Sequence, residues 1–284
     1  NLDASKNAYK RLKENILKIK DDGKVNEEYL SKFKEAENPM SPLGRFVYLR
    51  TYARFLPEKG RREHWWETVR RVVEHQSWLD EDMDMEEMED LYKSLYNLDI
   101  FASGRTMWTG GTELSRKIGM QNYNCSFVNM DKLENLKDIM YLGLIGTGVG
   151  TKLKKEDIEK LPNLRLDFDV DFIEPDEPKK RGKENTSLVF TEDNEAKLIV
   201  GDSKEGWSEA IDIFVKMHYY YAYKNVNKLT IDFSEVRASG TRLKSFGGTA
   251  SGHEPLKNTF VKWRNIFLKS NKDNKNRAIL NPID

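Results

Sequence analysis

The sequence has few of the residues that build disulfides or metal sites. It contains one cysteine, Cys125, and four scattered histidines in 284 residues. A single cysteine excludes an intrachain disulfide, and so few histidines do not provide the ligand spacing of a structural zinc site. We therefore expect no structural zinc site and no metal-ligating residues in this chain.

An excess of charge and long apolar runs are missing as well. Lys plus Arg and Asp plus Glu both number 47, so the formal net charge is zero, and no overall basic surface is available for nucleic acid or an anionic membrane. No run reaches the roughly 18 apolar residues of a membrane span, and the first residues form no secretory signal. These absences predict a cytoplasmic protein with no nucleic-acid or membrane partner, in which any phosphate site is local.

The two ends suggest an incomplete polypeptide. The first residue is Asn1 rather than Met, and residues 278–284 form an apolar run that enters a further element. A fragment, a split-gene product or a processed chain would have such ends.

Apolar residues recur at helical spacing through the first hundred residues. This periodicity predicts a charged helix over residues 2–19 and a second helix capped by Asn26. It also predicts a helix with Val69, Val72 and Val73 on one face, and another that begins near Asp84. We interpret these residues as a helical extension, 1–43, and a helical domain, 44–100.

The later sequence has an α/β pattern. A strand over Asn124–Val128, a helix over Leu133–Ile145 and the glycine loop Gly146–Gly150 follow one another. We expect these elements, in chain order, to be followed by a charged surface loop over 161–195, a strand over 197–201, a helix opened by a capping box of Asp202 and Glu205, a strand over 228–233 and a helix over 256–268.

Residue chemistry alone leaves the candidate sites open. A lone cysteine without a nearby histidine is more often an inert apolar residue than a nucleophile. The glycine loop completes neither common nucleotide fingerprint, so it is as consistent with a tight turn as with amides that meet phosphate. The segment from Arg242 to Gly252 combines basic, hydroxyl and glycine residues, which suits either an anion-binding loop or a flexible hairpin.

Several segments together point to one family. The chain resembles the monomeric adenosylcobalamin-dependent class of ribonucleoside triphosphate reductases in six segments, which occur in this order: RTYARFLPEKGRREHWWETVRRVVE (50–74), GRTMWTGGT (104–112), NCSFV (124–128), GTGVG (146–150), DSKEGW (202–207) and IDFSEVRASGTRLKSFGGTASGHEPL (231–256).

The resemblance implies an α/β fold in which the helical domain precedes a ten-stranded α/β barrel. Residues 101–153 would form the first barrel strands, and 154–275 a large α/β insertion that mimics a dimer contact and helps to form an effector site. Residues 276–284 would begin a truncated barrel element.

The resemblance also implies roles for particular residues. Cys125 would be one member of the cysteine pair that reduces the substrate. The implied substrate-binding residues are Ser103, Arg105, Asn124, Gly148 and Gly150. The implied effector-binding residues are Arg242, Lys244, Gly247, Gly248, Thr249 and Ser251.

The family's chemistry needs more than one thiol. Reduction of the ribose 2′-hydroxyl oxidises two thiols to a disulfide, while a separate thiyl radical abstracts hydrogen from the ribose. We therefore expect the chain to be inactive without a C-terminal catalytic barrel chain. The other implied partners are adenosylcobalamin in the complete enzyme, a ribonucleoside triphosphate or diphosphate substrate, a deoxynucleoside triphosphate effector and a thioredoxin-like reductant.

Two departures and one alternative accompany this interpretation. Thr147 stands where the family usually has a glycine, and Phe101-Ala102 where it often has Thr-Pro. The alternative is a non-catalytic subunit that binds nucleotide for regulation or completes a separate catalytic chain.

Overall fold

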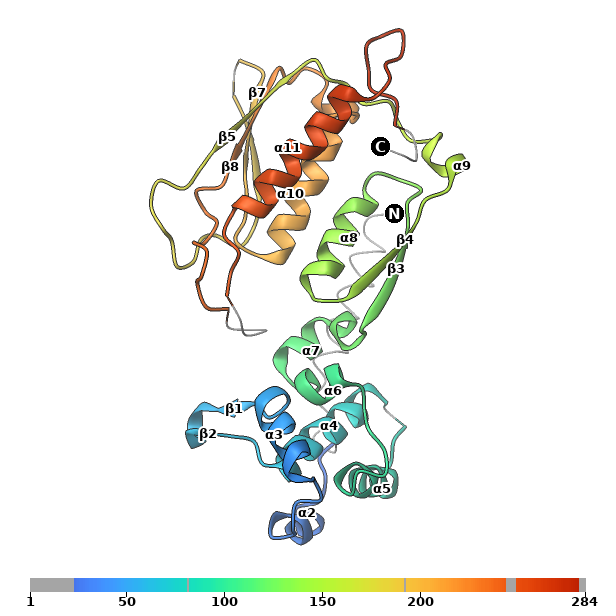
Figure 1. Ribbon diagram of the computed structural model, residues 1–284, viewed down its shortest axis with the longest axis vertical. Helices are drawn as coiled ribbons and strands as arrows, with labels where there is room; N and C mark the ends of the chain where they lie inside the picture. The colour runs from blue at the N-terminus through green and yellow to red at the C-terminus, as the bar shows by residue number, and fades with distance from the viewer. Residues whose placement is uncertain (1–22, 81, 192, 244–248, 281–284) are drawn as a thin grey trace. The chain divides into compact units, whose positions relative to one another are not determined.

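The computed structural model describes residues 23–80, 82–191, 193–243 and 249–280. The chain forms two compact units, Asn1–Asn122 and Tyr123–Asp284 (Figure 1). The helix predicted over residues 2–19 lies outside the described residues. Among the residues described, no helix has the length and apolar character needed to cross a membrane.

The first unit is mainly helical, and its only described strands form one short antiparallel pair. Its elements are α2 (Glu27–Lys34), α3 (Pro42–Thr51), β1 (Phe55–Leu56), η1 (Pro57–Lys59), β2 (Arg61–Arg62), α4 (Trp65–Leu79), α5 (Met85–Tyr96), α6 (Gly104–Thr109), α7 (Glu113–Lys117) and η2 (Gly119–Asn122).

Helices α4 and α5 build the core of this unit. Val69, Val72 and Val73 are fully buried on α4, which confirms the predicted apolar face. The predicted start of α5 is also confirmed, because the Asp84 side chain accepts a hydrogen bond from the backbone N–H of Glu87. Such a cap satisfies a backbone donor that the first helical turn leaves unpaired.

The second unit combines two sheets with helices. Its elements are β3 (Cys125–Asn129), α8 (Asn135–Leu144), β4 (Gly148–Lys152), α9 (Lys155–Ile158), β5 (Asp169–Ile173), β6 (Ser187–Phe190), β7 (Glu195–Ile199), α10 (Lys204–Met217), η3 (Tyr221–Tyr223), β8 (Lys228–Asp232) and α11 (Glu254–Lys269). β3 and β4 form a parallel pair, and the larger sheet has the order β5-β8-β7-β6, with β6 antiparallel to its neighbour.

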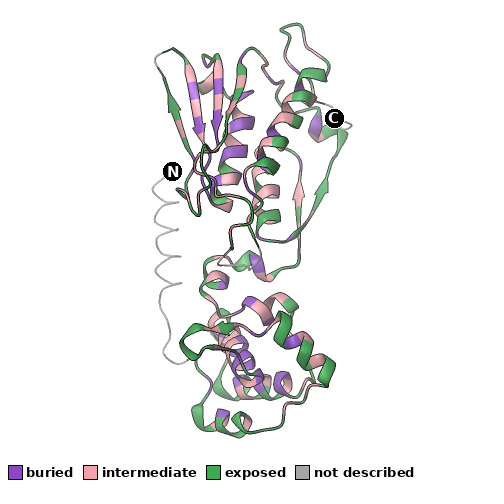
Figure 2. Ribbon diagram, turned by 60° about the vertical axis from the view of Figure 1, so that its left-hand side comes forward, coloured by how far each residue is buried: buried purple, intermediate pink, exposed green. Residues whose placement is uncertain are grey.

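Helices α10 and α11 lie on one face of the larger sheet (Figure 1). Leu198 on β7 and Ile231 on β8 are fully buried there, as are Phe214 on α10 and Phe260 on α11. Figure 2 colours such buried positions within each unit. Burial of apolar side chains contributes about 1.5–3 kcal/mol each, so this layer fixes the sheet against its helices.

The structure differs from three expectations about secondary structure. Residues 161–195 are not one surface loop, because they contain β5, β6 and the start of β7. The glycine loop is only partly a loop, since Gly148–Gly150 belong to β4. Residues 104–109 form helix α6, and the contacts place everything up to Asn122 with the first unit. The domain limits proposed from the sequence stay a prediction.

The predicted cap of α10 is also wrong. Ser203 caps this helix, because its hydroxyl accepts the N–H of Gly206. Instead, both carboxylate oxygens of Asp202 accept hydrogen bonds from the Nε–H group of Arg237, at 2.8 Å (Oδ1) and 2.9 Å (Oδ2). The carboxylate therefore joins the start of α10 to the segment after β8.

Candidate functional site

Cys125 begins strand β3 and its side chain is exposed. In the parallel register it lies opposite Gly148 on β4, and Phe127 lies opposite Gly150. The backbone N–H of Gly148 donates to the carbonyl of Asn124 at 2.8 Å. The structure thus brings together four of the predicted residues: Asn124, Cys125, Gly148 and Gly150.

Cys125, Gly148 and Gly150 share one face of the two-stranded sheet. Side chains alternate between the faces of a strand, so Cys125 and Phe127 point to the same side. That side is exposed at Cys125, Phe127, Gly148 and Gly150, whereas helix α8 contacts both strands. A thiol beside bare backbone can meet a ligand at close range.

The fold itself does not require glycine at these two positions. An added Cβ at Gly148 would come no closer than 3.5 Å to its nearest neighbour, the carbonyl oxygen of Asn124, and at Gly150 no closer than 3.4 Å, to the ring of Phe127. Their φ angles also lie outside the left-handed region, unlike that of Gly146 at 82°. Glycine in a strand without such a need is typical of a place that a ligand or another backbone approaches closely.

Thr147 occupies a different environment from these glycines. Its side chain is buried, and its hydroxyl donates to the carbonyl of Tyr123 at 3.4 Å. The threonine side chain therefore fills the interior behind the turn.

Ser103 and Arg105 lie in the first unit, around helix α6. Ser103 caps this helix through the N–H of Thr106, and Arg105 donates to the carbonyl of Gln121 at 3.4 Å. Arg71 anchors the same helix, since its guanidinium donates to carbonyls there and pairs with the buried Glu63 at 2.7 Å. The roles predicted for Ser103 and Arg105 stay a prediction.

The predicted effector segment is described only in part. Arg242 and Thr249 form an isolated antiparallel bridge. Lys244, Gly247 and Gly248 lie outside the described residues. Ser251 follows this bridge and lines a cavity of about 340 Å³.

This cavity lies between the segment that follows β5 and the beginning of α11. Its wall includes Lys179, Arg237, Ser251 and His253. Arg237 is fixed by Asp202, and Lys179 pairs with Glu235 at 3.3 Å. Ends of parallel strands next to a helix N-terminus are common ligand positions in α/β sheets.

Comparison with protein families identifies both units. Residues 25–112 match the ribonucleotide reductase alpha domain, and residues 169–267 match the insertion domain of B12-dependent ribonucleotide reductase. The chain belongs to the class II ribonucleotide reductases. The resemblance found in the sequence is thereby confirmed.

Individual relatives agree with this family. An adenosylcobalamin-dependent ribonucleoside-triphosphate reductase of Lactobacillus delbrueckii subsp. bulgaricus is 33% identical over 273 residues, which cover 82% of this chain and 37% of that protein. The protein of the same name from Euglena gracilis is 30% identical, covering 80% of this chain and 30% of its own length. The chain therefore spans about a third of the length of these relatives.

A solved class II structure has a similar fold. A crystal structure of a B12-dependent (class II) ribonucleotide reductase superposes with a TM-score of 0.70 at 28% identity. The match covers 86% of this chain and 39% of the other. The mixed α/β architecture expected for the class II reductase chain is confirmed at this level.

Sequence patterns missed two groups in this class II reductase chain. The Asp202–Arg237 pair escaped because a carboxylate just before a helix looks like a cap. Glu174 and His253 escaped because they are far apart in the sequence and meet only through the pairing of β5 with β8 and the position of α11. The histidine before α11 was the one available signal.

Proposed function

We propose that this chain forms part of an adenosylcobalamin-dependent reductase that converts ribonucleoside triphosphates to deoxyribonucleotides. It would supply the helical domain, the first strands of a ten-stranded barrel and the insertion that mimics a dimer contact. The names of the relatives support the substrate and the cofactor. The observation that carries the proposal is the exposed Cys125 thiol on β3 opposite the bare backbone of Gly148.

The proposed role of Cys125 is to provide one of two reducing thiols. The ribose loses its 2′-hydroxyl as water and gains a hydrogen in its place. The two thiols lose two electrons and two protons and form a disulfide, so atoms and electrons balance. A thioredoxin-like dithiol would then reduce the disulfide and restore the pair.

The second thiol of the pair has to come from elsewhere, because Cys125 is the one cysteine of these 284 residues. The exposed sheet face around Cys125 supports a partner. Phe127 and the preceding Tyr123 are 63% and 62% exposed, and β3 and β4 pair only with each other among the described strands. Further barrel strands from a C-terminal catalytic part would cover this surface and bring the missing cysteines.

The glycine positions of β4 would accept the substrate. Without side chains, Gly148 and Gly150 leave room for a ribose against the sheet beside Cys125, and Asn124 lies at the same strand end. Ser103 and Arg105, which lie in the first unit, are further substrate-binding residues of this proposal. The bridged residues Arg242 and Thr249, with Ser251 after them, would bind the phosphates of a deoxynucleoside triphosphate effector, for which Arg is well suited.

The cavity described above is too small for the cofactor. The cavity has a volume of about 340 Å³, which lies near the lower limit for sites of drug-sized ligands. A corrinoid is larger than such ligands. In the complete enzyme, adenosylcobalamin would supply the radical.

Replacement of Cys125 by serine tests the proposal. The variant and the parent chain are each combined with the C-terminal part of a class II reductase, and deoxynucleotide formed per active site is measured. The parent should give multiple turnovers, and Cys125→Ser should lose them while nucleotide binding persists, because no disulfide can form.

Stability controls separate this role from simple packing. If Cys125 were only a small exposed residue, Cys125→Ser would change the free energy of unfolding by about 0.5 kcal/mol or less, and turnover would stay near that of the parent chain. Cys125→Ala provides a matched variant without a hydroxyl. Near-normal turnover by either variant would remove Cys125 from the mechanism.

A further inference from the structure

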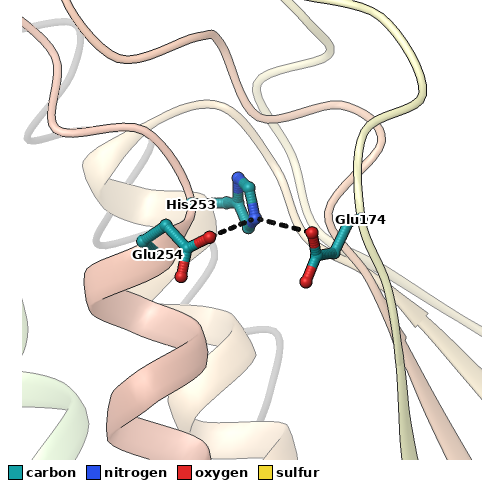
Figure 3. Close-up of side chains that lie close together, drawn as sticks. All are labelled: Glu174, His253 and Glu254. Atoms are coloured by element: carbon teal, nitrogen blue, oxygen red, sulfur yellow. Dashed lines mark ion pairs between the residues drawn. The ribbon is translucent and has the colours of Figure 1, made fainter.

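Three side chains with ligand atoms for metals meet at the edge of the larger sheet. Glu174 follows β5 directly, His253 precedes α11 and Glu254 is its first residue. Their ligand atoms all lie within 4.8 Å of one another. The Nε2 atom of His253 faces both carboxylates, at 4.0 Å from Glu174 and 3.5 Å from Glu254 (Figure 3).

The imidazole is held in place with one nitrogen unsatisfied. Nε2 of His253 is buried and has no hydrogen-bond partner among the described residues. The ring packs against Phe233, with centroids 5.5 Å apart. A buried polar atom without a partner costs free energy, and native structures usually satisfy it with protein, water or an ion.

The adjacent cavity is also negatively charged. His253 and Glu254 belong to its wall, together with Asp176 and Glu177. The cations of that wall, Lys179 and Arg237, are already paired with Glu235 and Asp202. A cation bound at the three side chains would therefore be attracted by Asp176 and Glu177, for which no ion pair is seen within the described residues.

We propose that Glu174, His253 and Glu254 bind a divalent first-row transition-metal cation at the wall of this cavity. One imidazole nitrogen with two carboxylate oxygens suits Mn²⁺ or Zn²⁺ better than Mg²⁺, which prefers oxygen ligands. Three protein ligands leave coordination positions for water or for a phosphate oxygen. The site does not depend on the reductase function, and it can exist whether or not Cys125 reduces a ribose.

Lys257 competes for one of the ligands. Its ammonium group forms an ion pair with Glu174. The carboxylate must therefore exchange the ammonium for the metal before it can bind a cation. Removal of Lys257 should free Glu174.

Titration with Mn²⁺ tests the site directly. Free Mn²⁺ is counted by its electron paramagnetic resonance signal as the full chain is added, and Zn²⁺ is then used to displace the bound ion. One Mn²⁺ per chain is expected. His253→Gln and Glu174→Gln should each weaken binding at least about tenfold, since loss of a group that merely supports a ligand already costs that much.

Lys257→Ala gives the opposite expectation and separates a metal site from an ion-pair network. It should strengthen Mn²⁺ binding, whereas Glu86→Gln, an exposed carboxylate change in the first turn of α5, should leave it unchanged. The absence of binding, binding that survives both ligand variants, or weaker binding in Lys257→Ala would overturn the proposal. Glu174 is 52% exposed, so its variant should fold normally.

Discussion

Removal of the Arg237 side chain would leave a carboxylate buried without its counter-charge. The Asp202 side chain is 4% exposed, and it accepts bonds from Nε of Arg237 and from the backbone N–H groups of Arg237 and Gly182. Breaking one partner of a buried pair typically costs 3–5 kcal/mol. We expect Arg237→Ala to destabilise the second unit by about that amount.

The reverse change should cost less. In Asp202→Ala the remaining guanidinium is 21% exposed and can turn toward water. In the double variant neither charge is left unpaired. The sum of the unfolding free energies lost in the two single variants should therefore exceed the loss in the double variant by more than about 1 kcal/mol, as is usual for residues in one network. The coupling therefore measures the pair rather than either residue alone.

Ser203→Ala supplies the matched comparison, because Ser203 is the observed cap of α10. Loss of a helix cap lowers the unfolding free energy by about 1 kcal/mol. In a double variant with Arg237→Ala, this decrease should add to the decrease caused by Arg237→Ala. Hydrogen exchange of the buried backbone amides of β8 would measure the unfolding free energy of the second unit separately from that of the first unit. Additive losses for Asp202→Ala and Arg237→Ala, or a cost below 1 kcal/mol for Arg237→Ala, would refute the reasoning.

The parts of the fold that could be predicted are those in which one segment alone carries the signal. Val69, Val72 and Val73 mark the buried face of α4 by spacing, and Asp84 with Glu87 marks the start of α5. Strand β6 gave no such signal. It has no buried residue and lies at a sheet edge, so its pairing with β7 determines its structure.

In the candidate site, too, the features that could be predicted are those that depend on one segment alone. The position of Cys125 on a strand followed from alternation along that strand. The position of Gly148 opposite Cys125 could not be predicted from residue patterns, because the register between two strands joined by a helix is set by tertiary packing. Glycine is also depleted in strands, so Gly148–Gly150 suggested a loop although they pair with β3.

Two further tests concern the insertion region. Arg242→Ala should weaken binding of a deoxynucleoside triphosphate about 10- to 150-fold, since a charge-assisted hydrogen bond contributes about 1.5–3 kcal/mol. Equilibrium dialysis would measure the affinity, with the exposed Lys180→Ala as control, and an unchanged affinity would contradict the effector assignment. Burial lowers the pKa of His218 from its ordinary value of 6.5 to about 3, so between these values the unfolded chain binds a proton that the folded chain does not. The stabilising effect of the neutral ring is complete above pH 6.5 and is lost as the pH falls toward 3. Between pH 5.5 and 4.5 the parent should lose about 1.3 kcal/mol more unfolding free energy than His218→Gln, because one proton contributes about 1.4 kcal/mol per pH unit. Denaturant unfolding at the two pH values would measure this difference, and equal losses would show that His218 already carries its proton in the folded chain or stays neutral in the unfolded one.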